Sequence, residues 1–145
     1  YFNADQSLLV TSDSEVESID DLADDIVGVQ AGTAGQIATQ GLIDSGRVGG
    51  GRTYRIIGEA FKALQAGQVD GVVYNLSAAQ EQVETSEGTL RIVEPVPTGD
   101  QYGIAFPEDS DLVGPVNEAL AQIKADGTYE EIYERWIGLP PEEIP

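Results

Sequence analysis

The sequence has 145 residues, of which 26 are Asp or Glu and 7 are Lys or Arg, and it contains neither histidine nor cysteine. The net charge of −19 excludes nucleic acid as an expected partner, because phosphate binding needs a basic face. Without these two residue types the chain has no disulfide, no thiolate nucleophile and no histidine base or ligand, so we expect no catalytic residue, no metal and no cofactor.

The acidic, lysine-poor composition also indicates the salt concentration in which the protein works. Such a surface is typical of proteins from salt-loving organisms, where dense salt screens the repulsion between carboxylates, and we expect that adaptation here. No stretch stays apolar for the ~20 residues that a membrane span requires. Residues 1–5 resemble the interior of a domain rather than a secretion signal, so we expect a leader and further chain to precede them.

Strand and helix patterns alternate along the chain, which predicts an α/β fold with a mainly parallel sheet. The predicted strands are short and rich in β-branched or aromatic residues. In chain order we expect a strand at 7–10, a strand at Ile26–Gln30, a helix from Thr33 to near Gly46, a strand at 54–57, a helix at 59–66, a strand at 69–74, a helix from Ser77 to about residue 84, and strands at 90–93 and 102–106.

Helix starts have their own pattern. A Ser or Thr followed three residues later by Gln or Glu is typical of a capping box, in which side chain and backbone satisfy each other's donors. This pattern occurs at Thr33, Ser77 and Thr128. After residue 107 only helical spacing remains, and it predicts two helices that end at Gly127 and Gly138; their apolar residues are Val113, Val116, Leu120 and Ile123, then Tyr129, Ile132, Tyr133 and Trp136.

Several segments, in one order, carry a resemblance to a known family. They are GVQAGTAG at 28–35, EAFKALQAGQVDGVV at 59–73, YGIA at 102–105, NEAL at 117–120, IKADGTY at 123–129 and IYERWIG at 132–138. The sequence resembles the family 3 extracellular solute-binding proteins, the polar amino-acid binders, over about the C-terminal two-thirds of the family's length.

The resemblance implies a type II periplasmic-binding-protein fold, in which two α/β lobes joined by hinge strands close on a solute. It implies that residues 7–98 form a complete second lobe. Residues 1–6 and 99–145 would supply the hinge and the C-terminal helices of a first lobe whose N-terminal portion lies outside this chain. By the same analogy, the strands at 7–10 and 102–106 would be the hinge strands.

The small-residue loop before the helix at Thr33 is the first candidate binding site. Backbone N–H groups at a helix N-terminus suit a carboxylate, and Gly32, Ala34 and Gly35 leave room for a ligand to approach them. The hydroxyl of Thr33 could add a hydrogen bond, or it could only cap the helix. The resemblance favours a seat for the solute carboxylate.

The end of the strand at 69–74 is the second candidate. Tyr74 and Asn75 would face the ligand there, because ligands bind outside the carboxyl ends of strands; the alternative for Asn75 is an ordinary turn residue. Family members have aspartate at this position as the partner of the solute's ammonium group, and Asn75 offers no counter-charge. Gln30 would face either the cleft or the solvent.

Two further patterns have structural explanations. The acidic run at 20–25 lacks the spacing of a calcium loop and is expected to be a solvated helix. The apolar stripe at Tyr129–Trp136 is expected to be core. Without the rest of its lobe, that stripe would lie open and favour a homodimer or segment exchange between copies.

The function that the resemblance implies is the solute-binding component of an ABC uptake transporter. Its expected location is outside the cytoplasmic membrane, in the periplasm or at the cell surface, with or without a lipid anchor on a preceding segment. Its expected partners are a small polar solute, such as an amino acid, and a membrane permease. Two alternatives share the fold: an enzyme such as a dehydratase or lytic transglycosylase, and the ligand-binding effector domain of a regulator or receptor. The enzyme alternative needs an acid or base, and the candidate residues supply none.

Overall fold

The computed structural model describes residues 1–138, 140–141 and 144–145, and these fall into two compact units. The larger unit is Asp5–Thr98, and the smaller combines Tyr1–Ala4 with Gly99–Pro145. The chain therefore crosses between units twice, after Ala4 and after Thr98. Each unit is described below by itself, and the assignment of residues 7–98 to a solute-binding lobe stays a prediction.

The larger unit contains a five-stranded sheet with the order β4-β3-β5-β2-β6. Strands β3, β4 and β5 run parallel to one another, whereas β2 runs antiparallel to both of its neighbours. The α/β fold is thus confirmed, but the sheet is mixed rather than mainly parallel. The strands are β2 (Gln6–Thr11), β3 (Ile26–Gln30), β4 (Gly50–Tyr54), β5 (Gly71–Asn75) and β6 (Leu90–Val96).

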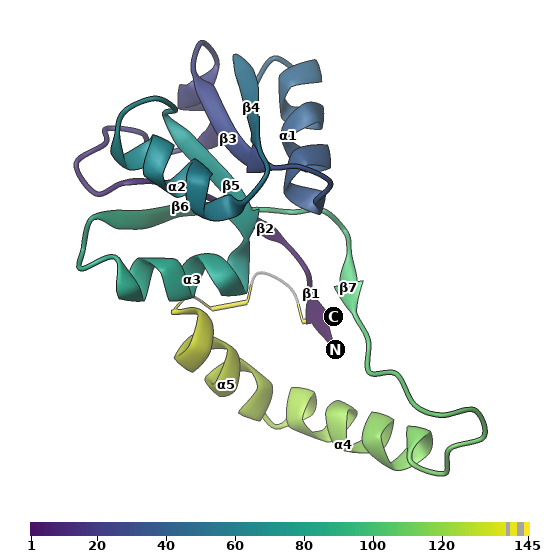
Figure 1. The fold of residues 1–145 in the computed structure, drawn as a ribbon. Helices are drawn as coiled ribbons and strands as arrows, with labels where there is room; N and C mark the ends of the chain where they lie inside the picture. The colour runs from purple at the N-terminus through teal and green to yellow at the C-terminus, as the bar shows by residue number, and fades with distance from the viewer. Residues whose placement is uncertain (139, 142–143) are drawn as a thin grey trace. The chain divides into compact units, whose positions relative to one another are not determined.

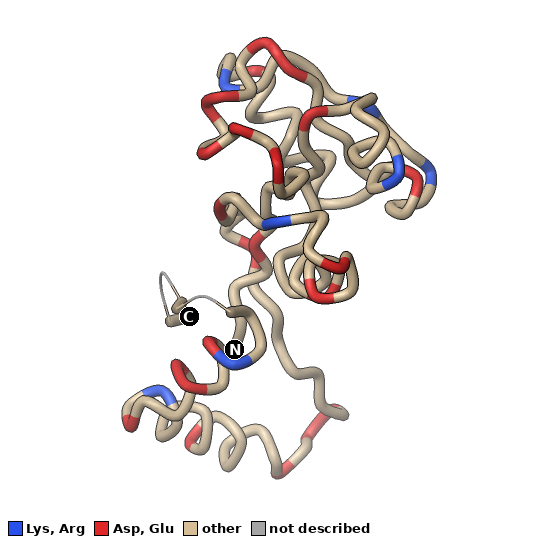
Figure 2. The backbone as a smooth tube through the Cα atoms, turned by 90° about the vertical axis from the view of Figure 1, so that its left-hand side faces the viewer, with Lys and Arg blue, Asp and Glu red and all other residues tan. Residues whose placement is uncertain are grey.

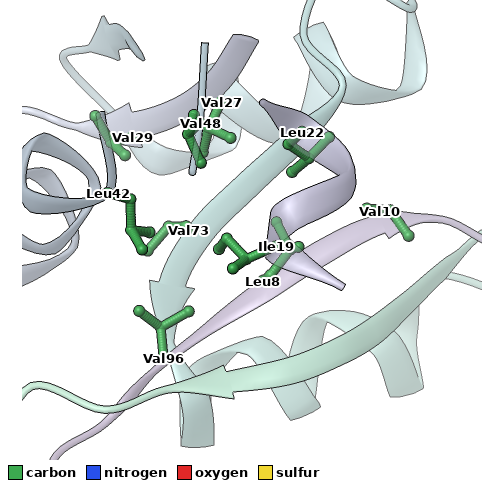
Figure 3. Packing of buried hydrophobic residues seen from close by; sticks show 10 residues of the cluster. All are labelled: Leu8, Val10, Ile19, Leu22, Val27, Val29, Leu42, Val48, Val73 and Val96. Atoms are coloured by element: carbon green, nitrogen blue, oxygen red, sulfur yellow. The ribbon is translucent and has the colours of Figure 1, made fainter. Parts of the chain in front are cut away.

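Helices cover both faces of this sheet (Figure 1). Alternating strand residues point to opposite faces, so Leu8 and Val73 join one core cluster while Leu9 and Val72 join the other. The first cluster packs under α1 (Ala34–Asp44) and the 3-10 helix η1 (Ile19–Leu22), and Figure 3 shows its ten buried side chains. The second packs under α2 (Ile57–Gln65) and α3 (Leu76–Thr85).

One predicted strand was wrong. The segment 54–57 was predicted to be extended, but β4 ends at Tyr54 and α2 already begins at Ile57. The true strand begins at Gly50 and pairs in parallel with β3, with Gly50 opposite Ile26. Because β4 is an edge strand that contains two glycines and few buried side chains, its sequence has no strand periodicity to detect.

Of the three predicted capping boxes, only the one at Thr33 caps its helix. Helix α3 is capped two residues earlier than predicted, by Asn75, whose side-chain oxygen accepts from the Ala78 N–H. Helix α5 (Thr128–Ile137) is preceded by Gly127 in the left-handed conformation, so Thr128 already lies in the helix. In both places a residue that also permits a tight turn takes the cap position: Asn75 two residues before Ser77, and Gly127 directly before Thr128.

The strand predicted at 7–10 is present in the larger unit, and its role as a hinge strand stays a prediction. It is the central part of β2, with Leu8, Leu9 and Val10 fully buried between β5 and β6. The other predicted hinge strand, 102–106, is reduced to β7 (Gln101–Tyr102), which pairs antiparallel with β1 (Phe2–Asn3) in the smaller unit. The pairing of β2 with β5 and β6 therefore lies within the larger unit, and the pairing of β1 with β7 lies within the smaller unit.

The smaller unit consists of the β1–β7 ribbon and two helices, α4 (Val113–Ala125) and α5, as the apolar spacing predicts. These helices enclose an apolar groove of about 220 Å³ with Tyr129 buried at its base. Burial raises the pKa of the Tyr129 phenol, and its hydroxyl has no hydrogen-bond partner among the described residues. On the outer part of α5, Trp136 is 72% exposed and Ile132 is 49% exposed, so the predicted core stripe is buried only in part.

Acidic residues are spread over both units and far outnumber the basic ones (Figure 2). In the acidic run at 20–25, Asp20 pairs with Arg47, and hydrogen bonds from the Glu17 and Ser18 N–H groups lower the pKa of Asp21. Within the described part of the chain, no group of acidic side chains could hold a metal ion. No described helix is long and apolar enough to pass through a bilayer.

Candidate functional site

The carboxyl ends of β3 and β5 form the edge of the larger unit at which the candidate residues lie. The two strands are parallel neighbours, so their ends meet at the same edge of the sheet. Helix α1 begins four residues after β3 and α3 follows β5 directly. Two helix N-termini, each the positive end of a dipole, therefore open at one place.

Backbone amides at the start of α1 are the first feature of this edge. Ala31 donates to Tyr54, and Gly32 donates to the side chain of Gln36. The next three amides, of Thr33, Ala34 and Gly35, make no hydrogen bond with any residue that the structure describes. Three adjacent donors at a helix N-terminus can bind one carboxylate or other small anion.

Gly35 places these amides against the sheet. A Cβ added at Gly35 would lie 3.0 Å from the Val73 carbonyl oxygen and 3.1 Å from Oε1 of Gln6. A side chain at this position would therefore require the Val73 carbonyl of β5 or the end of the Gln6 side chain to shift by a few tenths of an ångström. Gln6 in turn pairs with Asn75 on the neighbouring strand β5. Gln6 therefore lies between the start of α1 and Asn75, the second candidate residue.

The hydroxyl of Thr33 serves the loop itself. It donates to the Gln30 carbonyl at 2.8 Å and accepts from the Gln36 N–H at 3.3 Å. Its proton is therefore already used, and any hydrogen bond that Thr33 donates to a solute comes from its backbone. Gly32, with a φ of +72°, shapes the turn before it and is exposed.

Asn75 ends β5 and caps α3. Its Oδ1 accepts the Ala78 N–H at 3.3 Å and the Ser77 hydroxyl at 2.7 Å. Ser77, which was predicted to begin this helix, instead orients the cap. The side chain of Asn75 is thus held at the edge beside the Gly35 contact.

The side chains of the other two candidates make their contacts elsewhere. Gln30 ends β3 and donates to the Arg55 carbonyl at 3.4 Å, so its side chain leans toward β4. Tyr74 stacks edge-on against Phe61, with ring centroids 5.8 Å apart, and packs with the core cluster under α2. The edge therefore brings together Gly32, Thr33, Ala34, Gly35 and Asn75, whereas Gln30 and Tyr74 flank this group.

Charge sets this edge apart from the rest of the molecule. Residues 26–43 and 71–80 contain no Asp or Glu, although the chain has 26 of them. The first turns of α1 and α3 hold no acidic residue, although acidic side chains are favoured there. The positive ends of both helices are therefore left uncompensated, which suits an anion.

Two residues at this edge were missed by sequence reasoning. Gln6 is 5% exposed at the start of β2 and contacts the Gly35 turn, and Arg55 lies exposed between β4 and α2 next to Gln30. A polar residue at the start of an apolar strand was the available signal for Gln6. The signal for Arg55 was a basic residue at the end of a strand, which is notable because the chain has only 7 Lys and Arg residues.

Comparison of the sequence with known proteins shows the family to which the chain belongs. The model of the bacterial extracellular solute-binding proteins, family 3, matches residues 1–139. The chain belongs to this family. The glutamine-binding protein GlnH of an ABC transporter from Bacillus subtilis is 30% identical to this family 3 chain, over 99% of the chain and 52% of the relative.

Solved structures agree on the fold of this family 3 chain, which is that of the type II periplasmic binding proteins. The substrate-binding domain 2 of Lactococcus lactis GlnP, in an open conformation, superposes with a TM-score of 0.80 at 19% identity, over 97% of this chain and 61% of that one. The arginine-, lysine- and histidine-binding protein ArtJ of Geobacillus stearothermophilus is 32% identical with a TM-score of 0.59, over 98% and 62%.

The family 3 chain spans about half of the length of the glutamine-binding relative and about three-fifths of the two structures. Among the matched relatives are a binding protein of an ABC transporter, a periplasmic arginine-binding protein and an extracellular arginine-binding protein.

Proposed function

We propose that this chain is part of the extracytoplasmic solute-binding component of an ABC importer and that it binds a small polar carboxylate, such as an amino acid or a related acid. One observation carries the proposal: the three adjacent amides of Thr33, Ala34 and Gly35 have no partner among the described residues, and residues 26–43 and 71–80 around them contain no Asp or Glu. A carboxylate would accept from these amides, and the dipole of α1 would stabilise its charge.

The expected mechanism is closure about the hinge of the complete protein, with residues 7–98 as its second lobe. Contacts to the solute from both lobes stabilise the closed state, which the membrane permease then recognises. The chain acts as a carrier rather than an enzyme, because the residues at the edge offer no acid or base to transfer a proton. Membership of this family supports a location outside the cytoplasmic membrane. Attachment there through a lipid anchor is part of the proposal.

A titration of the full-length protein tests this proposal. We expect calorimetry with a panel of amino acids and related carboxylates to find a solute that binds at micromolar concentration or below, about −8 kcal/mol or stronger. Binding should also reduce the radius of gyration in small-angle scattering, because the lobes close. A protein that binds none of these carboxylates, or that converts one into a product, would contradict the carrier function.

Self-association is a further part of the proposal, and it concerns the apolar groove of α4 and α5. Trp136 and Ile132 lie open at this groove, and a second copy could cover them. We expect the 145-residue chain to sediment increasingly as a dimer between micromolar and millimolar concentration, and Trp136→Lys to shift it to monomer. Leu112→Lys is the matched control, because Leu112 is 60% exposed outside the groove. A compact monomer at every concentration would exclude self-association.

A further inference from the structure

The side chain of Asn75 carries an inference about the chemical class of the solute. We propose that the solute is a carboxylate without a free ammonium group, such as a 2-oxo acid, a 2-hydroxy acid or an N-acylated amino acid, and that Asn75 is the residue that discriminates against the amine. This inference rests on the proposed function, because it concerns the same edge of the sheet. The proposed function allows amino acids and related carboxylic acids as solutes. The inference retains only the acids that lack a free ammonium group.

The first step is the hydrogen bonding of the Asn75 oxygen. A carbonyl oxygen has two lone pairs, and both are used here, one by the Ala78 N–H and one by the Ser77 hydroxyl. The amide cannot be turned around, because the backbone N–H of Ala78 only donates and must face an oxygen. The nitrogen of the amide also only donates. Asn75 therefore cannot accept a hydrogen bond from an ammonium group without giving up one that holds the start of α3.

The second step is the lack of a counter-charge. No Asp or Glu occurs in residues 26–43 or 71–80, which supply β3, β5 and the first turns of α1 and α3. Asp5 is the nearest acid along β2, and its carboxylate accepts from the Thr98 N–H at 3.2 Å. An ammonium group enclosed beside Asn75 would thus lose its hydration and meet the positive ends of two helices, which disfavours its binding.

The third step is what the same edge favours. The amides of Thr33, Ala34 and Gly35 attract a carboxylate whether or not the solute also has an amine. A keto, hydroxyl or acylamino substituent next to that carboxylate is uncharged and needs no acidic partner. Donors without a partner among the described residues, a saturated acceptor, and no acid in residues 26–43 and 71–80 together select acids of this kind over free amino acids.

Matched pairs of solutes test the inference on the full-length protein by calorimetry. The pairs are 2-oxoglutarate with L-glutamate, L-lactate with L-alanine, and N-acetyl-L-glutamine with L-glutamine. We expect the member without an ammonium group to bind at least about tenfold more tightly in each pair that binds. Equal or tighter binding of the amino acid would overturn the inference and leave the proposed function standing. No binding by any of the six, nor by any member of the wider panel of amino acids and related carboxylates, would overturn both.

Three variants show whether Asn75 causes the selectivity. Asn75→Asp keeps a capping oxygen and adds a second, charged acceptor, so it should shift the preference toward the amino acid by at least about tenfold. Ser77→Ala releases one lone pair of the Asn75 oxygen and should shift the preference in the same direction by about threefold. Thr85→Ala is the matched control at the far end of α3, where the hydroxyl donates to the Glu81 carbonyl.

The result that would contradict the role of Asn75 is an unchanged preference in Asn75→Asp with an unchanged melting temperature. Asp5→Asn covers the remaining alternative, in which Asp5 serves as the ammonium partner. We expect Asp5→Asn to leave the ratio of the two affinities unchanged within each pair. A loss of amino-acid binding in Asp5→Asn alone would show that the edge does accept an ammonium group and would overturn the inference.

Discussion

Replacing Leu8 by alanine is expected to lower the free energy of unfolding of the larger unit by about 3 kcal/mol. Leu8 is 0% exposed in β2, and its side chain lies in the core cluster under α1 and η1 (Figure 3). Alanine would leave a cavity between strands that pair on both sides, and such strands relax only in part. Urea denaturation followed by circular dichroism measures the loss.

The control for this measurement is Leu112→Ala. Leu112 precedes α4 and is 60% exposed, so its truncation should change the free energy of unfolding by less than about 0.5 kcal/mol. Tryptophan fluorescence is unsuitable as the probe, because the one tryptophan, Trp136, belongs to the smaller unit. A loss below about 1 kcal/mol for Leu8→Ala would mean that β2 is not central to the core.

The fold was predictable where side-chain periodicity and packing agree. Buried strands such as β3 are runs of Val and Ile, and α4 and α5 have clear apolar spacing, so their positions followed from the sequence. β4 was not predictable, because two glycines at an edge give no pattern and its strand character comes from pairing with β3. The antiparallel direction of β2 was also hidden, since it is set by its pairing with β5 and β6.

The candidate site was predictable to the level of its loop and strand ends. Small residues before a helix indicated Gly32, Thr33, Ala34 and Gly35, and the end of a buried strand indicated Asn75. The contacts that define the chemistry join residues distant in the chain, as Gly35 meets Gln6 and Val73, and no local pattern encodes them. The same holds for the saturated oxygen of Asn75, because the sequence shows a Ser and an Asn but not their hydrogen bond.

Replacing Ala34 by proline is expected to weaken solute binding by about 10- to 100-fold, with little change in the melting temperature. Ala34 is the first residue of α1, where proline is tolerated because the N–H has no partner within the helix, and Thr33 before it is already extended with φ −110° and ψ 163°. The substitution removes the central one of the three amide donors and leaves the Thr33 cap in place. Ala34→Gly keeps the N–H and is the matched control, with an expected change of less than about threefold. Calorimetry on the full-length protein measures both variants, and an affinity that Ala34→Pro does not change would show that these amides are not the carboxylate seat.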